Sequence, residues 1–184
     1  MDHSTGNPEF ITIKELILGG ARSGKSGLAQ QRALASGMPV VFIATAVAGD
    51  EEMAVRIARH RNCRPREWMT IEEPLALAAA LRDQAMPGRC IVVDCLTLWL
   101  SNVMHEGDGC RTAQTDALLE VLPNAPGHVI LVSNEVGQGI VPAQPLARRF
   151  RDHAGCLHQR LADLCDRVTL TVAGLPLELK GANR

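Results

Sequence analysis

The sequence lacks several features that mark common classes of protein. Its 184 residues include 19 Lys and Arg against 20 Asp and Glu, so it has no basic excess of the kind that nucleic-acid binding requires. It has no apolar run of membrane-spanning length, and no basic segment followed by an apolar one as in a secretory signal. We therefore expect a cytoplasmic protein with no nucleic-acid partner and no membrane span.

The cysteines lack the spacing of a metal site or a disulfide scaffold. No CxxC pair occurs, and the six residues are scattered, which is typical of free thiols. They are Cys63, Cys90, Cys95, Cys110, Cys156 and Cys165. No internal repeat or linker is present, so we expect one domain over residues 11–184. The polar, turn-rich residues 1–10 are interpreted as a disordered leader or tag remnant.

Short apolar runs alternate with helical patterns along the chain. Strands are expected at residues 14–18, 40–44, 89–93, 128–133 and 168–173. Helices are expected at residues 25–35, 50–61, 74–84, 96–105, 115–122 and 145–167, with a loop at 106–109. This alternation predicts an α/β fold whose mostly parallel sheet is covered by helices on both faces. Ligands of such sheets bind beyond the carboxyl ends of the strands.

One segment matches the phosphate-binding pattern G-x-x-x-x-G-K-[ST] between a strand and a helix. Its glycines let backbone N–H groups surround phosphates, and the helix N-terminus adds positive potential. Lys25 is expected to reach the β- and γ-phosphates, and the Ser26 hydroxyl to ligate Mg²⁺. We predict a single P-loop (RecA-like) domain that binds a nucleotide here. The segment consists of Gly19, Gly20, Ala21, Arg22, Ser23, Gly24, Lys25 and Ser26.

Asp94 is a candidate second ligand of the magnesium ion. It ends the apolar strand Ile91-Val92-Val93, where such a carboxylate belongs in P-loop proteins. The alternative is an aspartate that only caps the next segment.

P-loop proteins include switches, motors and transferases. No Asn-Lys-x-Asp motif that would read guanine in a signalling GTPase is present, and the chain is short for a motor. A small transferase is favoured.

Several segments together resemble one family over about residues 16–180. The most specific are the Asn-Glu-Val-Gly-x-Gly-Ile-Val-Pro string and the Arg-His-Arg region. The sequence is similar to the bifunctional adenosylcobinamide kinase / adenosylcobinamide-phosphate guanylyltransferases of cobalamin biosynthesis. The matching segments lie at 18–26, 42–46, 50–53, 56–61, 64–68, 93–102, 133–142, 149–152 and 159–162.

The resemblance implies two reactions. An NTP, either ATP or GTP, phosphorylates adenosylcobinamide, and GMP from GTP is then transferred to adenosylcobinamide phosphate with release of pyrophosphate. It also implies a covalent GMP–histidine intermediate on His60. A neutral imidazole can attack the α-phosphorus, and nearby arginines can neutralise developing charge. Without the resemblance, a surface histidine on a basic helix face is the more common case for His60. Some members carry two adjacent histidines where this chain has Arg59-His60.

The resemblance places further nucleotide contacts at the ends of neighbouring segments. Glu72 has the alternative of an exposed loop carboxylate. From the residues themselves, Glu135 is a candidate to orient the substrate hydroxyl or a metal-bound water, or it caps a turn. Arg148, Arg149 and Arg151 are candidates for phosphate contact or form a solvated helix face. The implied contacts are Ala44, Thr45, Ala46, Arg61, Asn62, Cys63, Arg64, Glu72 and Asp94.

Other readings stay open from the residues alone. A P-loop kinase for another small hydroxyl substrate would need no nucleophilic histidine, and a nucleotide-dependent switch would transfer nothing. One small domain offers limited concave surface for a large, partly flat corrin. A site at a subunit interface would extend that surface, and the resemblance implies a homotrimer.

Overall fold

The computed structural model describes residues 12–62 and 64–181. The expected leader 1–10, Cys63 and the side chain of Arg56 lie outside this described part. The elements in chain order are β1 (Lys14–Gly19), α1 (Lys25–Ala35), β2 (Val40–Ala44), α2 (Glu51–Asn62), β3 (Met69–Glu72), α3 (Leu77–Gln84), β4 (Cys90–Asp94), α4 (Leu96–His105), α5 (Asp108–Val121), η1 (Leu122–Asn124), β5 (His128–Asn134), α6 (Pro145–Leu164), β6 (Arg167–Val172) and β7 (Leu175–Lys180).

Seven strands form one sheet in the order β3-β2-β4-β5-β1-β6-β7. Every neighbouring pair is parallel except β6 and β7. Successive side chains of a strand point to opposite faces, and both Leu16 and Ile17 of β1 are fully buried. Both faces of the central sheet are therefore covered, which explains why its strands read as continuous apolar runs.

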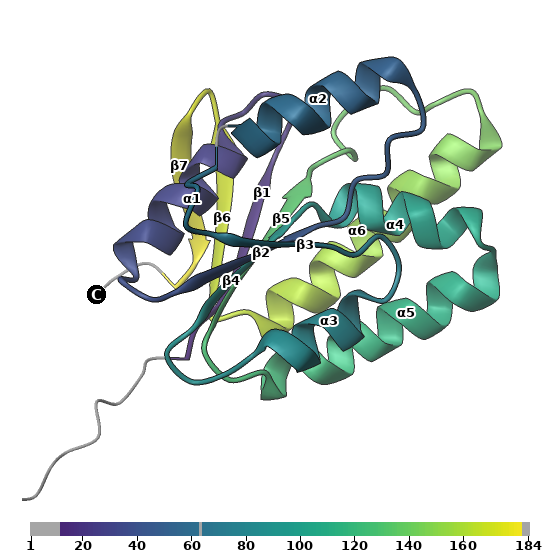
Figure 1. The fold of residues 1–184 in the computed structure, drawn as a ribbon. Coiled ribbons are helices and arrows are strands. Elements are labelled where there is room, and N and C mark those ends of the chain that lie inside the picture. Colours follow the sequence, from purple (N-terminus) through teal and green to yellow (C-terminus); the bar gives the residue numbers. More distant parts are fainter. Residues whose placement is uncertain (1–11, 63, 182–184) are drawn as a thin grey trace, which may run out of the picture.

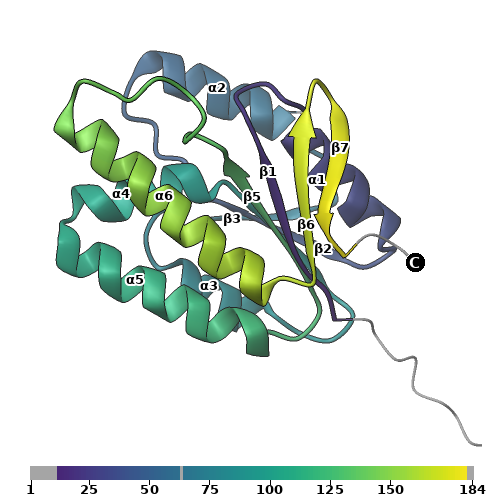
Figure 2. The ribbon, with the colours of Figure 1, turned by 180° about the vertical axis from the view of Figure 1, so that it is seen from behind.

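Helices pack on both faces of the sheet (Figure 1). Ala29 and Ala33 of α1 pack with Ile17 and Phe42 in the apolar cluster on one face. The larger cluster on the other face joins Leu16 to α3, α4, α5 and α6 through residues such as Trp99. Seen from behind, α5 and α6 run side by side across that face (Figure 2). The predicted fold class is confirmed.

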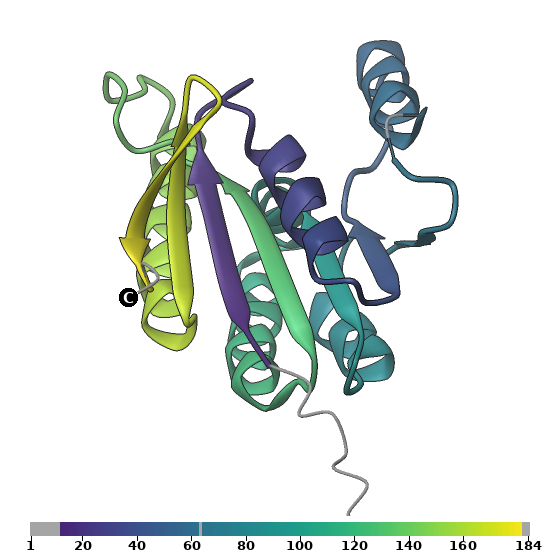
Figure 3. The same ribbon diagram turned by 90° about the vertical axis from the view of Figure 1, so that its left-hand side faces the viewer.

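The carboxyl ends of the parallel strands meet at one edge of the sheet. Gly19 is in register with Asn134, and Ala44 with Asp94. Helix α2 lies at this same edge and stands apart from α1 (Figure 3). Among the described residues it packs extensively against no other helix or strand. At this edge the strand ends are part of the sheet, whereas helix α2 projects from it.

The structure corrects several predicted elements. The apolar runs predict five strands, and the structure adds β3 and β7, which are edge strands with largely exposed residues. Helix α3 begins at Leu77 rather than Pro74, because Glu73 accepts hydrogen bonds from the Leu75 and Ala76 N–H groups in a preceding turn. Helix α5 begins at Asp108, inside the predicted loop 106–109, and α6 ends at Leu164 rather than residue 167.

Candidate active site

The predicted phosphate loop lies between β1 and α1 at the carboxyl edge of the sheet. Its turn is closed by a hydrogen bond from Ser23 N–H to the Gly20 carbonyl (3.3 Å). Helix α1 then begins at Lys25, so its free N–H groups face the loop. A segment of this shape presents several N–H donors to one anion, as phosphate binding requires.

Gly24 is the position in the loop that most needs glycine. Its φ is +98°, and an added Cβ would lie 3.1 Å from Gly174 Cα in the turn between β6 and β7. The Gly174 N–H also donates to the Ser23 carbonyl at 2.8 Å. The β6–β7 turn thus packs directly on the back of the phosphate loop, a contact that the sequence analysis did not anticipate because it spans 150 residues.

The charge of Asp94, at the end of β4, acts on the ammonium group of Lys25. The Lys25 side chain is buried, and its ammonium donates to the Gly20 carbonyl at 3.1 Å. Burial lowers the pKa of Lys25, and the Asp94 carboxylate opposes that shift. The ammonium is therefore folded back onto its own loop, in the position from which it can bind phosphate oxygens.

The end of β2 is tied to β4 by a reciprocal pair of hydrogen bonds. Thr45 Oγ1 donates to the Cys95 carbonyl (2.7 Å) and accepts from the Cys95 N–H (2.9 Å). Asn102 donates to the Thr45 carbonyl at 2.9 Å. The predicted contacts Ala44 and Thr45 are buried, and Ala46 is half-buried. Asn102 has a supporting role that its position in a helix did not reveal.

Three further predicted contacts, Arg61, Arg64 and Glu72, lie near the ends of β2, β3 and β4. The Arg64 guanidinium lies 3.8 Å from the centre of the Phe42 ring, a cation–π contact. Burial lowers the pKa of Arg64, while the nearby Asp94 raises it. Arg61 forms an ion pair with Glu72, and both side chains are more than half exposed. Such an exposed pair stabilises the fold little, which leaves both groups available to a ligand.

His60 lies near the end of α2 and is exposed, as are Arg59, Arg61 and Asn62. Within the described residues, no hydrogen bond or ion pair joins His60 to the phosphate loop. The structure thus brings Lys25, Asp94, Arg61, Arg64 and Glu72 toward one edge of the sheet. It leaves the predicted nucleophile on a projecting helix at that edge (Figure 3).

The loop after β5 begins beside the phosphate loop. The Glu135 N–H donates to the Gly19 carbonyl at 3.0 Å. The Glu135 carboxylate accepts hydrogen bonds from the N–H groups of Gly137 (2.9 Å) and Gln138 (3.2 Å). Of the two readings of Glu135, this geometry supports the turn cap.

The three arginines near the start of α6 that the sequence singles out have intramolecular partners. Arg148 donates to the Pro142 and Ala143 carbonyls, while Arg149 and Arg151 pair with Asp108 and Asp152. Arg149 is exposed, in agreement with the reading of a solvated helix face, whereas Arg148 and Arg151 are half-buried and their contacts fix the loop and the helix surface.

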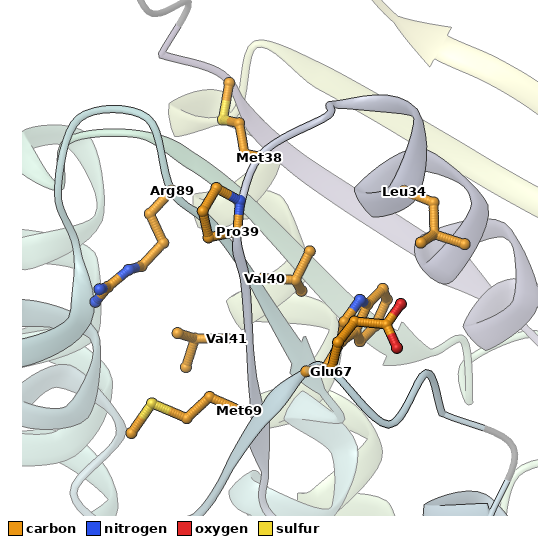
Figure 4. Close-up of a pocket in the computed structure, with 9 residues that line it drawn as sticks. Leu34, Met38, Pro39, Val40, Val41, Glu67, Met69 and Arg89 are labelled. Atoms are coloured by element: carbon orange, nitrogen blue, oxygen red, sulfur yellow. The ribbon is translucent and has the colours of Figure 1, made fainter.

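A hollow of about 420 Å³ lies at the other edge of the sheet (Figure 4). It is lined by the start of β2, including Pro39 and Val40, and by Leu34, Glu67 and Met69. Because Val40 is the first residue of its strand, this hollow is at the amino edge. It is therefore separate from the phosphate loop and is not the nucleotide site.

Together these features define the class of protein. A strand, a glycine-rich loop with a buried lysine and a helix N-terminus, with an aspartate ending a neighbouring strand, form a P-loop nucleotide-binding site. No helix in residues 12–62 and 64–181 combines the length and the hydropathy that crossing a bilayer requires.

Comparison with known families gives the particular group. The model of the family described as "Cobinamide kinase / cobinamide phosphate guanyltransferase" matches residues 15–179. The chain belongs to this family of enzymes, as the sequence resemblance predicted. It is 59% identical over 170 residues to the bifunctional adenosylcobalamin biosynthesis protein CobP of Pseudomonas aeruginosa, covering 92% of this chain and 98% of that protein. It is 37% identical over 180 residues to CobU of Salmonella typhimurium, covering 90% and 98%.

Solved structures support the fold alone. The flagellar accessory protein FlaH of Methanocaldococcus jannaschii matches with a TM-score of 0.53 at 13% identity, covering 91% of this chain and 78% of that one. The PH0250 protein of Pyrococcus horikoshii OT3 matches with a TM-score of 0.55 at 9% identity, covering 95% and 90%. At such low identity, these similarities say nothing about substrate.

Proposed function

We propose that this chain catalyses both reactions of its family in the cytoplasm. It phosphorylates adenosylcobinamide with ATP or GTP, and then transfers GMP from GTP to adenosylcobinamide phosphate through a GMP–His60 intermediate. The observation that carries this proposal is the phosphate loop with Lys25 and Asp94 at the same sheet edge as the basic end of α2, in a chain that matches the family over residues 15–179.

The kinase half rests on positioning and charge. The backbone N–H groups of residues 19–26 hold the β- and γ-phosphates, and the Lys25 ammonium binds their oxygens. The acceptor hydroxyl oxygen forms a bond to the γ-phosphorus as the bond to the β,γ-bridging oxygen breaks, and the hydroxyl proton is released to water. The nucleoside diphosphate leaves with the bonding electrons. Lys25 and the helix N-terminus stabilise the negative charge on the transferred group.

The residues present fit a magnesium ion shared with the nucleotide. Ser26 and Asp94 are the two side chains that would hold it, since Ser26 lies in the first turn of α1 and Asp94 ends β4 at the same edge of the sheet. No group of three or more His, Cys, Asp or Glu side chains in the described residues forms a metal site by itself. Two protein ligands agree with the preference of Mg²⁺ for phosphate and water oxygens, and the ion would neutralise phosphate charge there.

The transferase half assigns His60 as the nucleophile. One imidazole nitrogen attacks the α-phosphorus of GTP, a P–N bond forms, and pyrophosphate leaves. A phosphate oxygen of adenosylcobinamide phosphate then attacks the same phosphorus, the P–N bond breaks, and adenosylcobinamide-GDP is formed. Arg61 lies close enough to Arg64 for its charge to help lower the pKa of the Arg64 guanidinium, and the two side chains would hold the triphosphate.

The remaining implied contacts and the assembly are part of the same proposal. Ala44 to Ala46 would contact the ribose or base at the end of β2, with Asn62, Cys63 and Glu72 around the α2–β3 connection. We also propose that the active form is a homotrimer, as the family resemblance implies. A subunit interface would extend the limited concave surface that one small domain offers a corrin. Sedimentation at several protein concentrations would test the trimer separately from the chemistry.

The experiment that tests this function is labelling with GTP carrying radioactive α-phosphate, in the presence of Mg²⁺ and followed by a denaturing gel. Wild type is expected to carry a label that acid removes and alkali does not, as a phosphorus–nitrogen bond to histidine requires. His60→Ala is expected to carry none. His153→Ala, on the distant helix α6, serves as a matched histidine control and should label like wild type.

Two outcomes would contradict the proposal in different ways. If folded wild type phosphorylates a hydroxyl acceptor but is never labelled, a P-loop kinase for another small substrate is the better account. If wild type hydrolyses nucleotide slowly and transfers no group to an acceptor, a nucleotide-dependent switch is the better account.

A further inference from the structure

A second concave surface lies beside the phosphate loop rather than in it. The end of α4, the loop after β5 and the start of α6 enclose an open groove of about 410 Å³. Its lining is mostly apolar, with Met104, Val136, Leu146 and Phe150 among the residues, and polar groups such as Arg151 complete it. This composition and size are typical of small-molecule sites, which range over about 300–1,000 Å³.

The groove and the phosphate loop share one segment of chain. Glu135 donates its N–H to the Gly19 carbonyl at 3.0 Å, and the next residue, Val136, lines the groove. Gly19 ends β1 and opens the phosphate loop. A molecule held in the groove is therefore next to the edge at which the γ-phosphate is transferred.

The wall of the groove is held in place by hydrogen bonds. The Glu135 carboxylate accepts from Gly137 N–H, and Arg148 donates to the carbonyls of Pro142 (3.0 Å) and Ala143 (2.6 Å). These bonds fix both ends of the segment between β5 and α6. Since the wall is built before any ligand arrives, binding does not have to order it.

Apolar side chains around the groove are left uncovered. Ile140 is 98% exposed, Leu146 64% and Val141 59%, all on the same loop and the first turn of α6. A cluster of large exposed apolar residues beside a cavity is typical of a surface that binds an apolar partner. Such a partner would be larger than the groove itself, because Ile140 extends beyond its lining.

We propose that this groove binds the corrin ring of the acceptor and presents its hydroxyl arm to the phosphate loop, an inference that rests on the kinase function proposed above. The chemistry of the ligand matches: cobinamide is a broad, partly flat macrocycle with apolar faces and a rim of primary amides. One face would pack on Val136, Leu146 and Phe150, and Arg151 would donate to rim amide oxygens. The ring extends over the exposed apolar residues, and the aminopropanol arm reaches along Val136 toward Gly19.

The competing hollow at the amino edge does not meet the same requirement. Its residues include Val40 and Met69, the first residues of β2 and β3, so it faces away from the phosphate loop. An acceptor bound there would be at the wrong end of the strands for transfer from a nucleotide in the loop. It therefore provides a suitable control region.

The test uses Leu146→Glu, with Leu34→Glu as the matched control. Both leucines are exposed helix residues (64% and 53%), one beside the groove and one beside the other hollow, so both variants are expected to fold. Equilibrium dialysis with adenosylcobinamide measures binding by the visible absorption of the corrin. Steady-state kinetics at saturating nucleotide measure KM and kcat for the acceptor, and labelling from GTP measures nucleotide use without any acceptor.

For Leu146→Glu, we expect Kd and KM for adenosylcobinamide to rise about tenfold or more, because the substitution removes apolar contact and places a charge against the ring. Labelling should be unchanged, and Leu34→Glu should match wild type throughout. Unchanged acceptor binding in an active Leu146→Glu enzyme would overturn the groove assignment alone, as would a change of oligomeric state that accounts for weaker binding. Absence of acceptor phosphorylation by wild type would instead overturn the proposed function.

Discussion

The phosphate loop and α2 carry the two halves of the proposed chemistry, and the molecule supports them in different ways. The phosphate loop is attached to a buried strand and packed against the β6–β7 turn, and it holds a buried lysine. Helix α2 is exposed along most of its length and projects from the same edge (Figure 3). The loop is thus built before nucleotide binds, whereas the proposed mechanism requires His60 to be brought to the α-phosphorus.

This difference is consistent with what each half must do. A phosphate-binding loop gains from rigidity, because the fold already holds its N–H donors in place and they need not reorganise during the reaction. A nucleophile that forms and then breaks a covalent bond to GMP must approach one molecule and release it to another. A helix with few fixed contacts can change position at a low free-energy cost.

The largest expected effect separates the two regions by mutation. Lys25→Ala removes the buried ammonium and is expected to lower kcat of the kinase reaction by about 10²–10³-fold. His60→Ala is expected to leave the same rate within about threefold, since the kinase step does not use the imidazole. The measurement is phosphorylation of adenosylcobinamide by each variant at saturating nucleotide. An equally large loss in both variants would show that α2 belongs to the kinase site as well.

The second prediction concerns the support of the loop. Gly24→Ala is expected to destabilise the protein by about 1–2 kcal/mol, because its φ of +98° is unfavourable for a residue with Cβ and the new atom would contact Gly174. Gly27→Ala, three residues on in α1 with open space around it, is expected to stabilise by about 0.5–1 kcal/mol. Urea unfolding followed by circular dichroism compares the two. Equal free energies of unfolding in both variants would mean that the β6–β7 turn does not constrain the loop.

The sequence predicted the parts of this molecule that depend on local patterns. The strands β1, β2, β4, β5 and β6 read as apolar runs because they are buried on one or both faces. The edge strands β3 and β7 do not read as apolar runs: β3 is Met-Thr-Ile-Glu and is mostly exposed, and β7 contains Pro176. Their pairing with a neighbour, rather than their own burial, makes them strands.

The same distinction applies to the site. The phosphate loop and Asp94 are local motifs and could be found by spacing. Gly174 behind the loop and Asn102 beneath Thr45 act through contacts between distant segments, and no spacing indicates them. Glu135 was recognisable as a residue of interest, but only the geometry distinguishes a turn cap from a ligand contact.

The smallest expected effect concerns a buried polar chain next to the loop. His158 of α6 is buried, and its Nε2 lies 2.8 Å from Ser133 Oγ at the end of β5. Ser133 Oγ is 3.2 Å from Thr97 Oγ1, which also accepts the Asn134 N–H. Burial lowers the pKa of His158 below its ordinary value, and Glu135 opposes the shift. These hydrogen bonds support the end of β5, and the loop that begins with Glu135 follows directly after it.

The sign of the pH effect follows from the lowered pKa. As the pH falls through 6.5, the ordinary value for histidine, the unfolded chain takes up a proton that folded His158 resists. The free energy of unfolding therefore falls with falling pH. An asparagine can keep the hydrogen bond to Ser133 but cannot be protonated. His158→Asn should thus lose less stability than wild type between about pH 7.5 and about pH 5 in urea titrations. Any contribution of His128 is common to both proteins, so only the difference in slope is diagnostic. If the free energy of unfolding changed with pH by the same amount in both proteins, His158 would be protonated as easily in the folded protein as in the unfolded chain. The residues that support the Glu135 segment would then be less well shielded from water than the phosphate loop.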